Sequence, residues 1–156
     1  MKHFYQVVHK LAECYPKLNF VIKEHPNTRR IISKTLPKHD RIIFQNGRDT
    51  KELIKLSGAV MTLNSTVGIE AIVASKKVVV LANATYAIPG LVLIARNFSE
   101  LKARIDALSD WDIDTKIQTN FLDYIMTNFL FGKDCQTIDY TLANRLISIL
   151  DEKNKY

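Results

Sequence analysis

The sequence predicts an α/β fold, a Rossmann-like parallel sheet with helices on both faces. Short runs rich in Val, Ile, Leu and Phe alternate with longer segments whose apolar residues recur at helical spacing. This alternation is typical of parallel sheets, because parallel strands need a crossover, usually a helix, between them. The length of 156 residues, with 47% apolar residues and few Gly or Pro, fits one ordinary folded domain.

The first part of the chain begins with an amphipathic helix at Lys2 to Tyr15, which Pro16 ends. Asp49 is predicted to cap a helix that runs through Leu56, because Glu52 follows it at the spacing of a capping box. The other elements predicted here are a strand at Asn19 to Lys23, a weak helix at Thr28 to Leu36 and a strand at Arg41 to Phe44.

The middle of the chain has a strand at Ala59 to Leu63 and a helix at Thr66 to Ser75 with Ser65 as its cap. The run Val78 to Ala95 lacks charges over nearly the length of a membrane span, but polar residues and Pro89-Gly90 interrupt it, so strand, loop, strand is expected. The remaining predictions are a strand at Lys77 to Leu81, a helix at Ser99 to Leu108 capped by Ser99, and helices at Lys116 to Leu130 and Thr137 to Lys153.

We therefore expect a single domain over residues 1–156. Its α/β core would cover residues 1–114, and the C-terminal helices of residues 115–156 would pack on that core.

The turn Asn64-Ser65-Thr66 is the first candidate binding site. Unpaired backbone N–H groups and the positive end of the helix dipole favour an anion such as phosphate at a helix start. Ser65 and Thr66 add hydroxyl donors, and Gly68 permits a ligand or a neighbouring backbone to approach closely. Asn, Ser and Thr are also ordinary helix caps, so the turn alone does not separate the two interpretations.

Glu70 is a carboxylate on an otherwise apolar helix, so we expect it to be buried and to have a partner. Paired ribose hydroxyls would satisfy it, because a carboxylate accepts two hydrogen bonds side by side. A salt bridge to a nearby Lys or Arg would satisfy it equally well.

His25 follows the predicted strand at Asn19 to Lys23 and precedes Pro26, which restricts its backbone to extended geometry. The carboxyl ends of parallel strands meet at one edge of a sheet, so His25-Pro26 and the turn at Asn64 are expected at the same ligand-binding edge. His25 could donate to a phosphate oxygen, although a histidine that bonds a neighbouring carbonyl is the commoner case. Lys23 and Glu24 are expected to be solvated, as charges at a strand exit usually are.

The composition and the residue spacing argue against several other classes of protein. The two cysteines lack CxxC spacing, which argues against a disulfide framework or a zinc site and favours a reducing cytoplasm. The net charge of +6 is scattered, and aromatic residues are not interleaved with basic ones, so nucleic acid is not expected as a partner. Asp110, Asp112 and Asp114 lack following ligand residues, which favours a solvated loop over a metal site.

An ordered set of segments resembles the capsule polysaccharide biosynthesis family, which includes bacterial Kdo transferases that use CMP-Kdo to build the lipid-linked primer of the capsule. The resemblance is specific from about Leu18 to Leu93 and looser through the C-terminal helices. The segments that carry it are Lys23-Glu24-His25-Pro26, Asn64 to Ala71, Lys77 to Leu81, and the Tyr86 to Gly90 loop.

The resemblance implies the C-terminal, donor-binding half of a GT-B glycosyltransferase. His25, as a catalytic residue, and Pro26 would lie near the phosphate and cytidine. Ser65 and Thr66 would hold the phosphate, and Glu70 would take the ribose hydroxyls. The remaining donor-site residues would be Asn64 and Gly68. The reaction would transfer a sugar from the nucleotide donor to a lipid-linked glycan acceptor. It would need no metal or other cofactor, because the helix dipole and His25 would stabilise the departing phosphate.

A complete enzyme of this type needs a second half of similar size, so nucleotide binding is expected of this chain and catalysis would need an N-terminal half or a partner chain. The alternative is a non-catalytic Rossmann-like interaction module of a surface-polysaccharide assembly complex. Either protein is expected in the cytoplasm, with peripheral docking at the inner membrane through basic surface residues.

Overall fold

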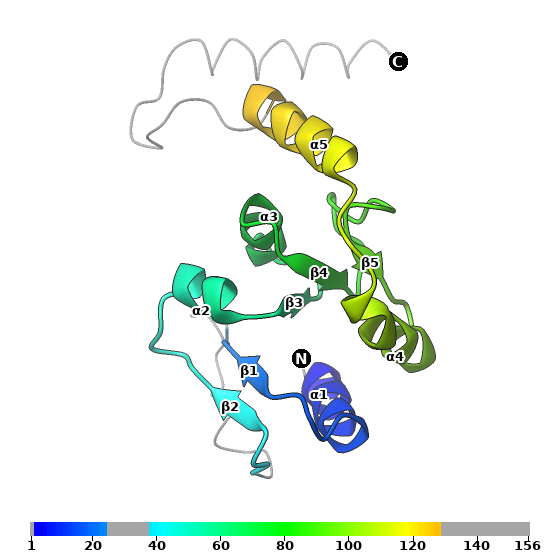
Figure 1. Cartoon of the computed structure of the whole chain (residues 1–156). Helices are drawn as coiled ribbons and strands as arrows, with labels where there is room; N and C mark the ends of the chain where they lie inside the picture. Colours follow the sequence, from blue (N-terminus) through cyan, green and yellow to red (C-terminus); the bar gives the residue numbers. More distant parts are fainter. Residues whose placement is uncertain (1, 25–37, 129–156) are drawn as a thin grey trace, which may run out of the picture. The chain divides into compact units, whose positions relative to one another are not determined.

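The computed structural model describes residues 2–24 and 38–128, and the chain divides into two compact units, Met1–Asp114 and Thr115–Tyr156 (Figure 1). The predicted helix at residues 28–36, the predicted helix at residues 137–153, and His25 and Pro26 all lie outside the described residues. In the second unit the described element is α5, Thr115–Asn128.

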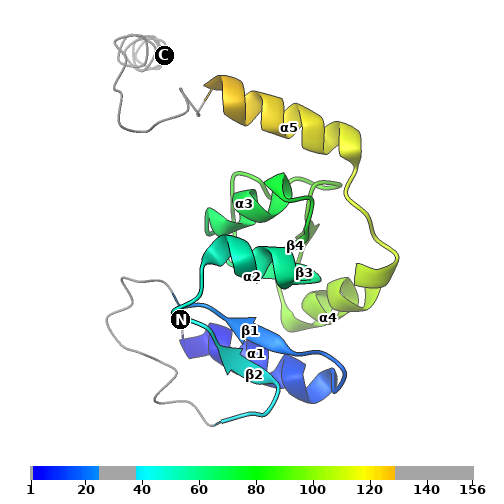
Figure 2. The same cartoon turned by 60° about the vertical axis from the view of Figure 1, so that its left-hand side comes forward.

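In the first unit, parallel strands alternate with helices, which confirms the predicted α/β class (Figures 1 and 2). The region expected to form strand, loop, strand contains β4 and β5, and no helix among the described residues is both long and apolar enough to cross a membrane. The elements are α1 Lys2–Cys14, β1 Phe20–Ile22, β2 Ile42–Phe44, α2 Thr50–Leu56, β3 Ala59–Thr62, α3 Val67–Val73, β4 Lys77–Val80, β5 Leu93–Ile94, α4 Phe98–Asp106 and the 3-10 turn η2 Ala107–Ser109.

The strands form two parallel sheets, where the sequence predicted one. β1 pairs with β2 through the register Phe20 to Ile42, and the second sheet has the order β3-β4-β5. β1 and β3 are therefore both edge strands within the described part of the chain. The hydrophobic pattern fixes which face of a strand is buried, but it does not fix which strands become neighbours, and this explains the error.

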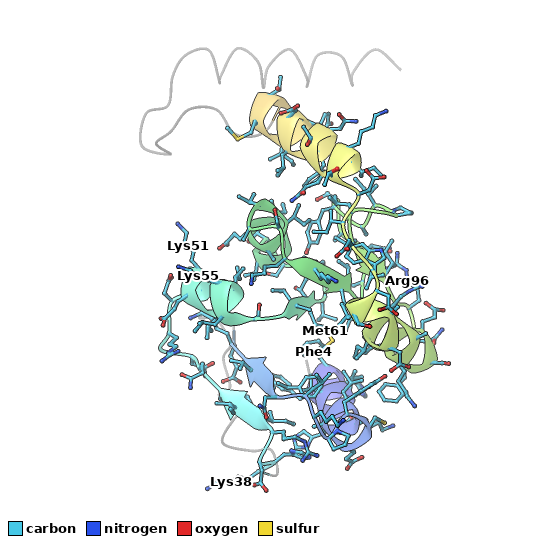
Figure 3. The ribbon with its side chains drawn as sticks, viewed as in Figure 1. Phe4, Lys38, Lys51, Lys55, Met61 and Arg96 are labelled. Carbon is cyan, nitrogen blue, oxygen red and sulfur yellow. The ribbon has the colours of Figure 1, made fainter. Side chains whose placement is uncertain are left out.

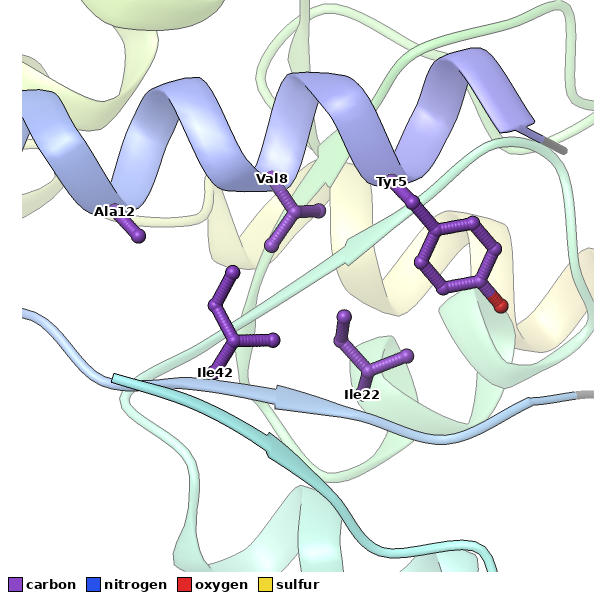
Figure 4. Packing of buried hydrophobic residues seen from close by; sticks show 5 residues of the cluster. All are labelled: Tyr5, Val8, Ala12, Ile22 and Ile42. Carbon is purple, nitrogen blue, oxygen red and sulfur yellow. The ribbon is translucent and has the colours of Figure 1, made fainter. Parts of the chain in front are cut away.

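Helix α1 covers the first sheet with one apolar face. Its buried side chains Tyr5, Val8 and Ala12 follow a spacing of three and four residues, which places them on one side of the helix. Figure 4 shows them projecting toward Ile22 of β1 and Ile42 of β2. This cluster stabilises the short two-stranded sheet, which would have little stability without a packed face.

The same helix also packs against the second sheet. Leu11 of α1 is fully buried with Val79 of β4, Leu93 of β5 and Leu101 of α4. The neighbours of Val79 on β4 point to the opposite face of the sheet, where α3 contacts β3 and β4. The second sheet therefore carries helices on both faces, and α1 joins it to the first.

The caps of α4 and α2 differ from the predictions. The helix expected to be capped by Ser99 begins at Phe98, and its cap is Asn97, whose Oδ1 accepts from the N–H of Glu100 at 2.8 Å. Glu100 completes the motif by accepting from Asn97 Nδ2 at 2.6 Å. Asp49 precedes α2 as expected, but its side chain forms no capping bond. Glu52 instead lies 3.5 Å from Arg48, so the reciprocal capping pair is on α4.

The difference between these two caps predicts different losses of stability when each cap residue is replaced by Ala. Asn97→Ala should lower the free energy of unfolding by about 1 kcal/mol, because it leaves the Glu100 N–H at the start of α4 without its acceptor. Asp49→Ala should cost clearly less, because no capping bond is lost. Urea unfolding followed by circular dichroism measures both. Equal losses in the two variants would contradict the assignment of the caps.

Candidate functional site

The turn between β3 and α3 uses most of its own polar groups. The Ser65 N–H donates to Thr62 Oγ1 at 3.3 Å, and the Val67 N–H donates to Ser65 Oγ at 3.3 Å. The N–H groups of the next residues donate to the carbonyls of Ser65 and Thr66. The start of α3 therefore presents fewer unpaired N–H groups than the sequence suggested.

Thr66, rather than Ser65, occupies the cap position of α3, and its side chain forms no capping bond. The sequence placed the cap one residue too early, although the Ser65 hydroxyl still satisfies the first N–H of the helix. Asn64, Ser65 and Thr66 are all exposed at this turn. Among the described residues, no internal hydrogen bond is found for the side chains of Asn64 and Thr66 at this turn.

Gly68 lies against the ring of Tyr86. Tyr86 is 2% exposed, and its hydroxyl donates to the Ser65 carbonyl at the turn. Burial raises the pKa of this phenol, which keeps it protonated as a donor. A Cβ at Gly68 would lie 2.6 Å from Tyr86 Cε2, so the group that approaches this glycine closely is a side chain of the protein itself. Tyr86 braces the turn, a role that the sequence did not reveal.

The expectation that Glu70 is buried is wrong, because the residue is exposed on α3. The buried residues of this helix are Gly68, Ala71 and Ile72, and the helical spacing puts Glu70 on the other side. Neither of the two ion pairs found among the described residues includes Glu70. A helix of seven residues beside a sheet buries one face only, so apolar neighbours in sequence did not imply burial.

A cleft of about 490 Å³ lies between the carboxyl ends of β1 and β3. Its polar lining residues come from different elements: Glu24 follows β1, Thr50 begins α2, and Asn64 and Ser65 follow β3. Phe4 and Met61, which Figure 3 labels, belong to its apolar lining, together with Tyr5, Leu53, Ile54 and Val60. A neighbouring cavity of about 670 Å³ shares Phe4 and Met61 and continues between the two sheets. Thr66 and Glu70 are not among the residues that line either cavity.

Glu24 is held in this cleft by a compact hydrogen-bond network. Its N–H donates to Asn46 Oδ1 at 2.9 Å, and Asn46 Nδ2 donates to its carboxylate Oε2 at 2.7 Å. The Tyr5 hydroxyl donates to Oε1 at 3.4 Å. Burial and the neighbouring Glu24 charge raise the pKa of Tyr5 to about 12, so at neutral pH Tyr5 remains protonated and able to donate.

Lys23 is tied to the backbone of the segment after β2, where its ammonium donates to the carbonyl oxygens of Asn46 and Arg48. The expectation that Lys23 and Glu24 are simply solvated is therefore wrong. Both residues fasten the ends of β1 and β2 together, and Glu24 also lines the cleft. The partners lie 19 to 25 residues apart in the sequence, so no local motif could have indicated them.

The loop that carries Asp110, Asp112 and Asp114 has a structural role in the described residues. Asp112 lies 3.1 Å from the ammonium of Lys77, and the Asp114 N–H donates to the Gly90 carbonyl at 2.9 Å. Among the residues that the structure describes, no group of three His, Cys, Asp or Glu side chains is arranged to hold a metal ion.

The fold and the cleft define a Rossmann-like α/β protein with polar side chains at the carboxyl ends of its parallel strands. Residues 1–125 match the model of the family described as capsule polysaccharide biosynthesis protein, and the chain belongs to this family. The resemblance to this family is thus confirmed. No solved structure matches the chain.

Two curated relatives are similar to the chain. Protein FixF of Sinorhizobium fredii (strain NBRC 101917 / NGR234) is 36% identical over 151 residues, which cover 97% of this chain and 37% of FixF. The capsule polysaccharide export protein KpsS of Escherichia coli is 35% identical over 96 residues, which cover 55% of this chain and 25% of KpsS. The chain therefore matches well under half the length of either relative.

Because Gly68 lies against Tyr86, we expect Gly68→Ala to destabilise the protein, although Gly to Ala changes usually stabilise a helix. Gly68→Ala should lower the free energy of unfolding by about 1–3 kcal/mol, because the new methyl group would overlap the buried ring. In an open helix the same change would stabilise by about 1 kcal/mol. Chemical denaturation measures the difference between wild type and variant.

Gly58→Ala is the matched control, because a Cβ there meets nothing within 4 Å, and it should be nearly neutral. Combining Gly68→Ala with Tyr86→Ala removes the ring, so the double variant should be more stable than the sum of the single effects predicts. Strict additivity would contradict the proposed contact.

Proposed function

We propose that this chain is the nucleotide-sugar-binding half of a glycosyltransferase in bacterial capsular polysaccharide biosynthesis, with CMP-Kdo or a related CMP-sugar as its donor. Membership of the capsule polysaccharide biosynthesis family supports the biological process. The observation that carries the binding role is the cleft between β1 and β3, which combines an apolar interior with polar groups at the carboxyl ends of two strands. Ligands of parallel α/β sheets bind at such edges.

The cleft has the size and chemistry that a nucleoside needs. Its volume of about 490 Å³ falls in the range of small-molecule sites, and its apolar residues offer surfaces against which a base can lie. The half-buried aromatic residue Phe4 is among them. Asn64 and Ser65, on the opposite wall from Glu24, supply polar groups for the rest of the ligand.

The charges favour a donor with a single phosphate. Among the described residues that line the cleft, Lys23 is the only cation, and its ammonium is engaged by two backbone carbonyls. A diphosphate would bring more negative charge close to Glu24, and the described residues that line the cleft supply no further cation. A CMP-sugar carries one phosphate, whereas UDP- and GDP-sugars carry two. Hydroxyl groups at the Ser65-Thr66 turn suit the smaller charge.

The roles of individual residues follow the family resemblance. Ser65 and Thr66 would bind the phosphate, Glu70 would approach the ribose hydroxyls from the exposed side of α3, and His25 with Pro26 would lie beside the phosphate and cytidine. The acceptor would be a lipid-linked glycan. Completion of the catalytic site by a further half or a partner chain belongs to the same proposal.

Calorimetry and thermal unfolding with CMP and CMP-Kdo test the proposal. A ligand at 100 times its dissociation constant stabilises the folded state by about 2.7 kcal/mol, which corresponds to a rise in Tm of about 5–10 °C for a domain of this size. Binding should weaken in His25→Ala, Glu70→Ala and Thr66→Val. Glu13→Ala and Thr127→Val, which change exposed residues that are not among those lining the cleft, are the matched controls.

Absence of binding to cytidine, uridine and guanosine nucleotides at millimolar concentration would refute the donor-site proposal. In that case the non-catalytic interaction module would become the better explanation, and salt-sensitive binding to a partner or to anionic lipid vesicles would be its signature.

A further inference from the structure

We propose that Glu24 reads the base of the bound nucleotide by accepting a hydrogen bond from an exocyclic amino group, which makes it the residue that selects cytosine over uracil. This inference rests on the proposed function and deepens it, because it assigns the specificity of the same cleft. Neither the sequence patterns nor the family resemblance gave Glu24 a role in binding.

Glu24 lines the cleft at the carboxyl end of β1, and Asn64 and Ser65 line it at the end of β3. Glu70, the other carboxylate considered for the donor, does not line it. A nucleotide whose phosphate reaches the Ser65-Thr66 turn and whose base enters the apolar interior therefore brings its base, rather than its phosphate, toward Glu24.

The chemistry of the Glu24 carboxylate limits which ligand group can lie beside it. An ionised carboxylate only accepts hydrogen bonds, and it repels phosphate. The ligand group beside it must therefore be a neutral donor. The amino group of cytosine is such a donor, whereas uracil presents a carbonyl oxygen at the same position, which would meet the carboxylate lone pair against lone pair.

Hydrogen bonds within the protein orient Glu24 before a ligand binds. Asn46 binds both the N–H and the carboxylate of Glu24, and Tyr5 from α1 donates to the other carboxylate oxygen. A carboxylate has about four acceptor positions, so donors that hold it do not by themselves prevent it from accepting from a ligand. A polar group that is oriented before binding discriminates more strongly between ligands, because it cannot rotate to avoid an unfavourable contact with a mismatched ligand. Asn46 is therefore a positioning residue for Glu24.

Isothermal titration of the full chain with CMP, UMP and the 5′-monophosphate of 2-pyrimidinone riboside, which lacks the amino group, tests the inference on the wild-type protein. CMP should bind at least about tenfold more tightly than either analogue, as expected for a hydrogen bond to a charged group. AMP, whose amino group lies on a larger ring, tests whether the cleft also limits the size of the base.

Glu24→Gln is the decisive variant. Its amide can donate to the uracil oxygen, so the CMP to UMP preference should fall by about tenfold or more, with UMP binding improved. Glu13→Gln removes an exposed carboxylate of α1 and should leave the preference unchanged. Circular dichroism of each variant establishes that it is folded, and the wild-type analogue series does not depend on any variant.

The outcomes separate the two proposals. Binding of CMP, UMP and the pyrimidinone analogue with equal affinity, or an unchanged preference in folded Glu24→Gln, would overturn the role of Glu24 and leave the donor site standing. Failure of the wild-type chain to bind any nucleotide would overturn the proposed function and this inference together.

Discussion

The structure of the first unit depends on the burial of α1 between two short sheets. Strands of two to four residues give little stability by themselves, and each sheet needs an apolar face covered by another element. Tyr5, Val8 and Ala12 supply that cover for β1 and β2, while Leu11 reaches the second sheet. A fully buried Leu contributes about 1.5–3 kcal/mol, which is a large part of the stability of a small domain. Because α1 touches both sheets, it also fixes the distance between the ends of β1 and β3, and hence the width of the cleft.

The core and the candidate site share a residue. Tyr5 is 3% exposed and packs in the first cluster, yet its hydroxyl reaches the carboxylate of Glu24 at the edge of the cleft. Asn46 approaches Glu24 from the segment after β2, so helix, first strand and second strand all converge on it. On the other wall, Tyr86 holds the Ser65 carbonyl and fills the space that Gly68 leaves open. Each wall of the cleft is thus braced by a buried tyrosine that donates to it, and the packing of the core sets the geometry of the polar groups.

The sequence predicted what local patterns determine. Four of the five strands lie within the segments predicted for them, because a short run of β-branched residues between turn signals identifies a strand without knowledge of its neighbours. The sequence also placed Asn64 and Ser65 at the end of β3, where the cleft lies. The errors concern long-range packing: the separation of the two sheets, the exposure of Glu70 and the network around Glu24 depend on partners that are distant in the chain. His25 and Pro26 lie outside the described residues, so their placement remains a prediction.

The separation of the two sheets has a cost in stability, which the proposed binding role would offset. If β1 paired with β3, the strands would form one continuous sheet and satisfy the backbone groups that now border the cleft. It would also close the space between Val21 and Val60 and bury Val21, which is 51% exposed. In the open arrangement, the apolar side chains and the backbone edges of β1 and β3, both edge strands among the described residues, border the same cleft as Glu24, Asn64 and Ser65. A flat aromatic base uses both features, because its faces are apolar and its rim carries donors and acceptors. A ligand could therefore form the hydrogen bonds and apolar contacts that β1 and β3 do not form with each other. For this reason the cleft is a better candidate for the binding site than the exposed start of α3 alone.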